Sequence, residues 1–390
     1  MKVHFIAIGG TIMHSLAIEL KKNGYIVTGS DDVIYEPSRS NLKKNNLLPN
    51  DDGWSIKNIV LDLDMVILGM HAKPNNPEII EAQKHNIPIV SFPEFIANYA
   101  LNKKRVVIAG SHGKTTITAM ILHVLSLNNV NVDYLLGAKI NLLDQQVQLN
   151  NNDVMIIEGD EYYSSILDKQ PKFMHYNPDI LVVSGVQWDH INVFPSFHEY
   201  KEAFITFFNA VIKNNSKIYY CNNDNFLIDF FSQKNTYSQS YNLPSYYIKN
   251  NSVILRYNNQ EFPLNIFGQH NLYNLEAAKY VCRELGVDEE NFYSSIQSFK
   301  GAARRLSILK KYEDHSIVYY DFAHSPSKVY ATINALHELY PKRYLIACLE
   351  LHTFSSLDKD FIPNYFNMVN QCDEFWLFVD EETLIRKKMD

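Results

Sequence analysis

Short apolar runs alternate with amphipathic segments along much of this chain. The runs lie at residues 2–8, 65–69, 106–109, 154–157 and 180–184, and each is followed by glycines or polar residues. Such runs are typical of parallel strands that are buried on both faces. Residues 12–20 and 117–125 instead place apolar side chains at helical spacing. The pattern predicts an α/β protein with open, mostly parallel sheets.

The first strand leads into a glycine turn that predicts a Rossmann-like half domain. Gly9 and Gly10 follow the strand, and the strand after the next helix ends at Ser30 and Asp31. The GxGxxG fingerprint of dinucleotide sites is incomplete, so we do not predict a dinucleotide site. The turn would let a phosphate or sugar approach the helix start, and Asp31 would meet a hydroxyl or a base edge. Alternatively, the glycines are only structural.

A histidine follows the strand at residues 65–69. His71 lies in the loop at the carboxyl end of this strand, where open α/β sheets bind their ligands. It either contacts a substrate or is a solvated loop side chain.

Residues 106–127 have the pattern of a strand, a tight loop and a helix, which predicts a phosphate-binding loop. Backbone N–H groups at the helix start would face an anion, the lysine would add a charge, and the following threonine would bind Mg²⁺. The alternative is a helix cap with a solvated lysine. The residues concerned are Gly110, Ser111, His112, Gly113, Lys114, Thr115 and Thr116.

Carboxylates gather after the strand at residues 154–157. The sequence there is Glu158-Gly159-Asp160-Glu161, and Mg²⁺ is the cation that favours both carboxylates and phosphates. We therefore expect Glu158 to bind Mg²⁺, although these acids could merely cap a helix. His190 follows the strand at residues 180–184 and is a second candidate, either as a metal ligand or to orient the phosphate.

Two later segments suggest nucleotide contacts. His270, Asn271 and Asn274 precede or begin a helix, where they either cap it or hold an adenine edge. Arg305 stands in the segment Gly301–Leu306, where adjacent arginines suit a clamp on phosphate charge. The alternative is ordinary surface charge.

Two further regions contain strand patterns. Residues 235–268 are rich in Tyr, Val and Ile, which predicts short antiparallel strands. Strands at residues 317–321, 343–349 and 375–379, with helices between them, predict a small parallel sheet. We expect further elements to be needed to complete it.

Composition limits the possible partners. The net charge of −7 argues against nucleic-acid binding. No segment reaches the ~20 apolar residues of a membrane span, and the four cysteines lack metal-ligand spacing. These features predict a cytoplasmic protein that binds neither nucleic acid nor membrane.

Six motifs in this order resemble those of the Mur ligase family, the amide-forming enzymes of peptidoglycan synthesis. They are GSHGKTT, EGDE, WDH, GQHNLYN, ARR and DFAHSP. The resemblance covers the whole chain and implies a three-domain α/β architecture. Its parts would be a Rossmann-like domain that binds UDP-N-acetylmuramate (1–102), a central P-loop ATPase domain (103–303) and a shortened Rossmann-like C-terminal domain (304–390).

The resemblance also assigns roles to single residues. Lys114 and Arg305 would contact the transferred phosphate, and Thr115, Glu158 and His190 would bind Mg²⁺. The ATP base and ribose would lie against His270, Asn271, Asn274 and Asp321. The UDP moiety would lie at Gly9, Gly10, Ser30 and Asp31.

The reaction that the resemblance implies is an ATP-dependent ligation through an acyl phosphate. The segments DKQPKFMHYNPDI, WDHINVF and LELHTFSS resemble the peptide-recycling branch of the family. That branch joins UDP-N-acetylmuramate to the tripeptide L-Ala-γ-D-Glu-meso-diaminopimelate. The alternatives are ligation of L-alanine to the same nucleotide, a UDP-sugar- and ATP-binding protein without turnover, and a P-loop kinase or NTPase of another kind.

Overall fold

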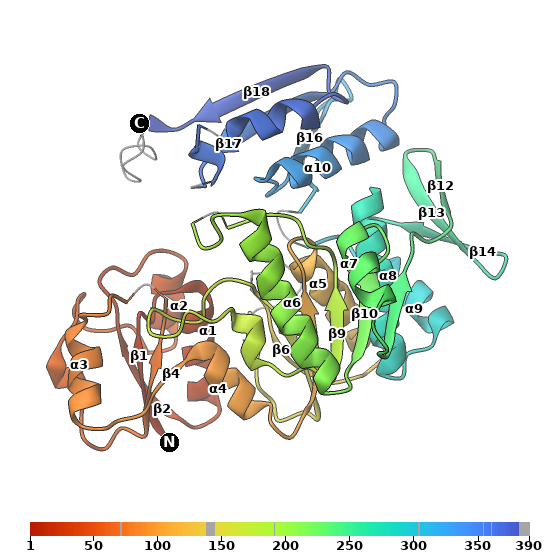
Figure 1. Cartoon of the computed structure of the whole chain (residues 1–390). Helices are drawn as coiled ribbons and strands as arrows, with labels where there is room; N and C mark the ends of the chain where they lie inside the picture. Colours follow the sequence, from red (N-terminus) through yellow and green to blue (C-terminus); the bar gives the residue numbers. More distant parts are fainter. Residues whose placement is uncertain are drawn as a thin grey trace. The chain divides into compact units, whose positions relative to one another are not determined.

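The computed structural model describes residues 1–70, 72–137, 145–190, 192–302, 305–353, 355–359 and 361–381 (Figure 1). The chain divides into two compact units. The first unit contains residues 1–109, 131–181 and 207–217, and the second contains residues 110–130, 182–206 and 218–390.

The first unit begins with a parallel sheet whose strands run in the order β2-β1-β3-β4. The strands are β1 (Lys2–Ile6), β2 (Ile26–Ser30), β3 (Met65–Leu68) and β4 (Ile89–Ser91). The helices of this region are α1 (Thr11–Lys22), α2 (Ser38–Lys44), η1 (Ile56–Asn58), α3 (Pro77–Lys84) and α4 (Phe92–Tyr99). Because the crossovers after β1 and β3 run in opposite directions, α1 and α3 cover opposite faces (Figure 1). The predicted Rossmann-like half domain is confirmed.

The core of this half domain follows from the apolar runs. Ile6, Val66 and Leu68 of the strands pack against Ile79 and Ala82 of α3, and all five are nearly inaccessible to solvent. Continuous burial of β-branched side chains is what a parallel sheet covered by helices requires.

A second described sheet has the strand order β11-β10-β9-β5-β8-β6-β7. Within the first unit, β8 lies between β5 and β6 in parallel, and β7 pairs antiparallel with β6. Within the second unit, β10 and β11 are parallel. The bounds are β5 (Lys104–Ala109), β6 (Asp133–Leu135), β7 (Val147–Gln148), β8 (Val154–Glu158), β9 (Ile180–Val183), β10 (Lys217–Cys221) and β11 (Ser238–Tyr241). The intervening helices are η2 (Lys172–His175), α6 (Phe197–Lys213) and α7 (Asn225–Ser232).

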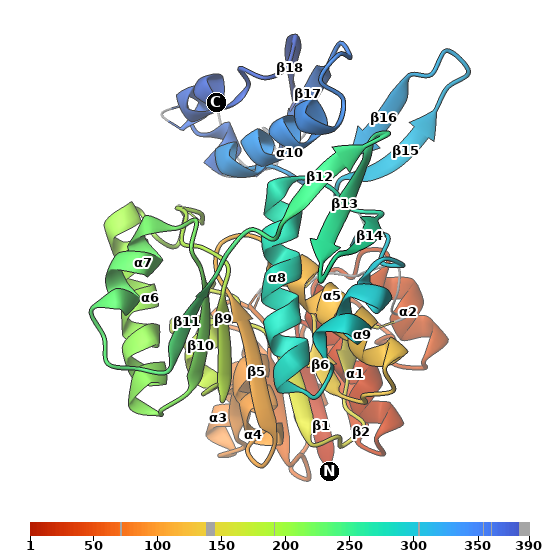
Figure 2. The ribbon, with the colours of Figure 1, turned by 90° about the vertical axis from the view of Figure 1, so that its right-hand side faces the viewer.

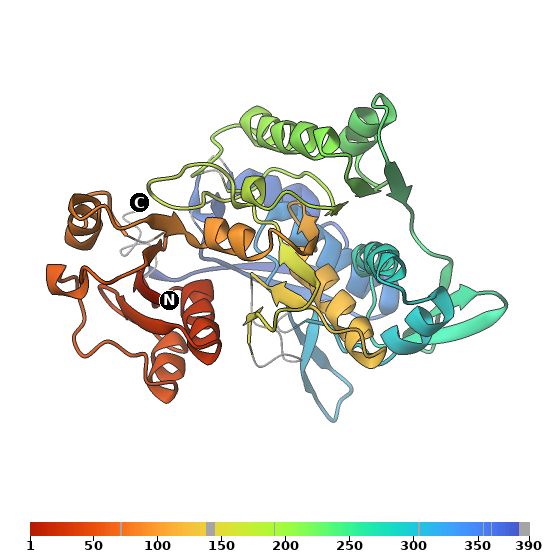
Figure 3. The same ribbon diagram turned by 90° about the horizontal axis from the view of Figure 1, so that it is seen from below.

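Helices pack against one another in the second unit. α5 (Lys114–Leu127) lies along α8 (Gln269–Glu284), and both contact α9 (Glu289–Ile296) (Figure 2). An antiparallel sheet of β12 (Tyr246–Lys249), β13 (Ser252–Tyr257) and β14 (Gln260–Leu264) lies beside α9 (Figure 3). The expectation of antiparallel strands over residues 235–268 is right for these three and wrong for β11, which is parallel to β10.

The last part of the second unit differs from its prediction. β15 (Ser307–Lys311) and β16 (Ile317–Tyr320) form an antiparallel hairpin, while β17 (Ile346–Leu351) and β18 (Glu374–Val379) form a parallel pair. The predicted single sheet of three parallel strands is therefore wrong for the described residues, because β16 pairs with the strand directly before it. The helices are α10 (Pro326–Leu339), η3 (Ser355–Leu357) and η4 (Ile362–Met368).

A small core joins α10, β17 and η4. Val329 and Ile333 of α10 pack against Leu349 and Leu351 of β17, and Tyr365 of η4 closes the cluster. Across the described parts of the chain, every helix is too short or too polar to span a bilayer.

Candidate active site

The loop between β5 and α5 has the geometry of a phosphate cradle. Gly110 and Gly113 have φ values of 118° and 82°, which side-chain-bearing residues rarely adopt. A Cβ atom on Gly110 would collide with the side chain of Ser184, and one on Gly113 would collide with Asn274. Glycine is therefore required at both positions for two reasons, its backbone conformation and the close approach of a neighbouring side chain.

The helix after the loop starts at the predicted lysine. α5 begins at Lys114, and its N-cap, Gly113, has no side chain to accept from the first N–H groups. The Nζ atom of Lys114 donates to the carbonyl oxygen of Gly110 at 2.6 Å. Thr115 and Thr116 follow in the first turn and are each 7% exposed. A helix start with a lysine and no capping side chain suits an anion.

Two predicted nucleotide contacts, Ser111 and His112, already have protein partners. The Ser111 hydroxyl lies 2.7 Å from the Tyr200 hydroxyl and accepts from the Gln187 N–H at 2.8 Å. The His112 Nε2 atom lies 2.7 Å from the hydroxyl of Ser327. These side chains hold the loop in shape together with the Ser111 N–H, which donates to the Gly185 carbonyl oxygen at 2.9 Å.

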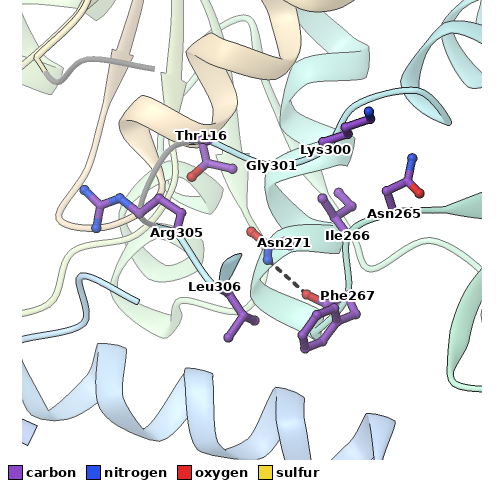
Figure 4. Close-up of a pocket in the computed structure, with 10 residues that line it drawn as sticks. Thr116, Asn265, Ile266, Phe267, Asn271, Lys300, Gly301, Arg305 and Leu306 are labelled. Carbon is purple, nitrogen blue, oxygen red and sulfur yellow. Dashed lines mark hydrogen bonds between the residues drawn. The ribbon is translucent and has the colours of Figure 1, made fainter. Parts of the chain in front are cut away.

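A narrow pocket of about 20 Å³ lies next to the loop (Figure 4). Thr116 and Arg305 line one side, and Ile266 and Phe267 line the other. Asn271 also lines the pocket, and its amide Nδ2 donates to the Phe267 carbonyl at 2.9 Å. Further lining residues are Asn265, Lys300, Gly301, Ala302 and Leu306. The lining therefore mixes apolar walls with polar side chains, and the space between them is about the size of one water molecule.

The other predicted nucleotide residues also belong to the second unit. Asn274 stands against Gly113, and burial lowers the pKa of His270 while the charge of Asp321 opposes the shift. Asp321 accepts from the backbone N–H of Leu306 at 3.1 Å and from the hydroxyl of Thr332. Asp321 therefore fixes the chain directly after Arg305.

Arg305 itself is held by an aromatic ring. Its guanidinium lies 5.3 Å from the centroid of the Phe322 ring, a cation–π contact that orients the side chain. Within the second unit, Arg305 and Asn271 thus line one pocket with Thr116 of the phosphate loop, and Asn274 lies against Gly113 of the same loop.

Glu158 lies in the first unit, where it is the last residue of β8 and is 8% exposed. Its Oε2 atom accepts from the N–H of Gly137 at 2.8 Å. Asp160, two residues on, pairs with Lys172 at 2.5 Å. Burial raises the pKa of Tyr176, and the negative charges of Asp160 and Glu158 raise it further. Two carboxylates therefore lie at this strand end, one held by a backbone N–H and the other by a lysine.

His190 lies in the second unit with a φ of 56°. Its backbone N–H donates to the side chain of Asp189 at 2.8 Å. Burial alone would raise the pKa of Asp189. The charges of Lys328 and His190 outweigh this effect and hold that pKa well below its usual range. Asp189 and Lys328, joined at 3.2 Å, were not singled out from the sequence.

The glycine turn of the N-terminal sheet contacts the predicted acid directly. The N–H of Gly9 donates to the Oδ2 atom of Asp31 at 2.7 Å, and a Cβ on Gly9 would lie 2.8 Å from the same atom. Gly10 is the N-cap of α1. Burial raises the pKa of Asp31 to about 7. His71 lies outside the described residues.

Ser30 belongs to a buried network that sequence reasoning missed. Its hydroxyl donates to the carboxylate of Glu78, which also accepts from the N–H of Ser55 at 2.9 Å and from Asn58 at 2.8 Å. The His4 ring lies 3.5 Å from Glu78. A signal was available, because a glutamate in the first turn after Asn76-Pro77 marks a helix start, but nothing in the sequence indicates its burial.

Comparisons with known proteins extend this description. A family model described as Mur ligase family, catalytic domain, matches residues 2–104, and one described as Mur ligase middle domain matches residues 108–282. The UDP-N-acetylmuramate–L-alanine ligase of Aquifex aeolicus is 32% identical, and the alignment covers 93% of this chain and 80% of the relative.

A second relative has a different substrate in its name. The UDP-N-acetylmuramate–L-alanyl-γ-D-glutamyl-meso-2,6-diaminoheptandioate ligase of Haemophilus influenzae is 30% identical over 86% of this chain and 76% of its own length. Among solved structures, the UDP-N-acetylmuramate–alanine ligase of Thermotoga maritima matches with a TM-score of 0.73 and 22% identity, covering 100% of this chain and 89% of that one. The fold is thus the three-domain α/β architecture predicted, and the chain belongs to the Mur ligase family of ATP-dependent ligases.

Proposed function

We propose that this chain joins the lactyl carboxylate of UDP-N-acetylmuramate to the amino group of L-Ala-γ-D-Glu-meso-diaminopimelate, with ATP as the energy source. The observation that carries the ATP half is the cradle of Gly110, Gly113 and Lys114, with Arg305 in the same unit. Family membership supports the ligase chemistry.

The proposed reaction has two steps. A carboxylate is a poor electrophile, so its oxygen first attacks the γ-phosphorus of ATP, ADP leaves, and an acyl phosphate forms. The peptide amine then attacks the acyl carbon, the C–O bond to phosphate breaks, and phosphate leaves. Lys114 and Arg305 would oppose the charge that spreads over the phosphoryl oxygens.

The metal ligands in this proposal are Thr115, Glu158 and His190. A hydroxyl, a carboxylate and an imidazole are a donor set that a divalent cation accepts, and the carboxylates at the end of β8 fit such a cation. Mg²⁺, when bound, would neutralise phosphate charge. The base and ribose of ATP would be held by His270, Asn271, Asn274 and Asp321.

The UDP part of the substrate would bind at the N-terminal sheet. Gly9 and Gly10 leave room for the diphosphate at the start of α1, while Ser30 and Asp31 would face the nucleoside. His71 is proposed as a further contact. The three domains would span residues 1–102, 103–303 and 304–390.

The identity of the amine substrate distinguishes two kinds of Mur ligase, one that adds the tripeptide and one that adds L-alanine. The segments at residues 168–180, 188–194 and 349–356 favour the tripeptide, and one relative has that name. The Aquifex relative instead favours L-alanine, so ligation of L-alanine is the second candidate.

The test is release of phosphate from ATP with UDP-N-acetylmuramate and either the tripeptide or L-alanine. Release with the tripeptide alone supports the proposal. Release with L-alanine alone assigns the second candidate. ATP binding without release in either case indicates a nucleotide- and UDP-sugar-binding protein without turnover.

A further inference from the structure

Lys328 lies in the first turn of α10, close to the phosphate loop, and has no role in the reaction described above. Its Nζ atom is 3.2 Å from the Oδ2 atom of Asp189, and the two side chains are 18% and 10% exposed. An ammonium that is largely withdrawn from water costs free energy unless nearby charges compensate it.

Two further cations lie close enough to affect Lys328. Besides burial, the charges of Lys114 and Arg305 lower its pKa, whereas Asp189 raises it. Lys114 and Arg305 are the two cations already assigned to the phosphate. A group of three cations beside the phosphate loop, where Ser327 next to Lys328 contacts His112, favours an anionic ligand.

Two polar atoms in the same region lack hydrogen-bond partners within the described residues. One is the hydroxyl of Ser325, the N-cap of α10, which is 5% exposed and accepts no capping bond. The other is the Nδ1 atom of His112, whose Nε2 atom contacts Ser327. Because buried polar groups are nearly always satisfied, both atoms are consistent with a polar ligand at this place.

We propose that Lys328 is a third cation that contacts the transferred phosphoryl group, delivered by α10 opposite Lys114. This inference rests on the proposed function. As the bond from the carboxylate oxygen to phosphorus forms and the bond to the ADP oxygen breaks, Lys328 keeps its protons and acts only through its charge. The start of α10, with Ser325, would contribute N–H and hydroxyl donors to the same oxygens.

The experiment compares a non-hydrolysable ATP analogue with ADP by calorimetry, because only the analogue carries the γ-phosphoryl group. Lys328→Ala should weaken binding of the analogue by roughly ten- to a hundred-fold, the loss expected for one charged hydrogen bond, and change ADP binding less than two-fold. Lys328→Arg should restore most of the difference. Lys328→Met keeps the aliphatic stem and serves if the alanine variant does not fold.

Lys342→Ala, an exposed lysine just beyond α10, is the matched control and should bind both nucleotides as the wild type does. Equal weakening of the analogue and ADP in Lys328→Ala and Lys328→Met, or no weakening, would overturn the inference while leaving the proposed function intact. A wild-type protein that bound neither nucleotide would overturn both.

Discussion

The Nζ atom of Lys114 lies 2.6 Å from the carbonyl oxygen of Gly110, so the first residue of α5 folds back over the loop that precedes it. This contact holds the ammonium at the mouth of the cradle. A ligand phosphate would compete for the same donor, which is what the proposed contact between Lys114 and the transferred phosphate requires.

Replacing this lysine should remove the reaction without unfolding the protein. Lys114→Met is expected to lower the rate of substrate-dependent phosphate release at least about 100-fold, a typical loss for one electrostatic contact to the transition state. Lys213→Met, an exposed lysine at the end of α6, should leave the rate unchanged. A rate within a few-fold of wild type in Lys114→Met would contradict the assignment.

Gly113 is constrained by its backbone conformation and by the close approach of Asn274, and a comparison with Gly24 separates these two effects. Gly24 has a φ of 83°, but a Cβ there would have open space, whereas a Cβ on Gly113 meets Asn274. Gly24→Ala should cost about 1–2 kcal/mol for its backbone conformation alone. Gly113→Ala should lower the midpoint of thermal unfolding further and weaken ATP binding; equal midpoints and unchanged binding would argue against a tightly packed loop.

Burial of Asp31 should make the stability of the protein depend on pH. Its pKa is raised from 3.8 to about 7, so between these values the folded protein holds a proton that the unfolded chain has released. Stability should therefore fall as pH rises through this window. Asp31→Asn should flatten the fall in the unfolding midpoint between pH 5 and pH 8, measured without ligand. Asp51→Asn, at an exposed position, should not; a wild-type curve that rises over this range would refute the assignment.

The Glu78 network should contribute strongly to the stability of the N-terminal sheet. Glu78 is fully buried and accepts from Ser30, Ser55 and Asn58. Glu78→Ala would leave these donors unpaired and should cost about 3 kcal/mol. Glu81→Ala, on the same helix but paired with Lys84, whose side chain is 66% exposed, should cost less than about 1 kcal/mol. Similar losses in urea denaturation would show that the buried network contributes no special stability.

The sequence by itself determined the local elements and the family. The strand before Gly110, the helix start at Lys114 and the strand that leads to Glu158 were all predicted, because burial on both faces and helical periodicity are written in neighbouring residues. The two glycines of the loop also predicted a tight turn, because only glycine adopts their backbone conformation without strain.

Tertiary structure decided which distant residues meet. β16 pairs with β15 rather than with the later parallel strands, and β11 joins β10 rather than the strands after it, because strand partners depend on long-range packing that periodicity does not encode. The same holds for His112, which contacts Ser327, and for Lys328, which contacts Asp189. Their spacings of more than a hundred residues carry no sequence signal, so only the folded chain shows that these polar groups meet.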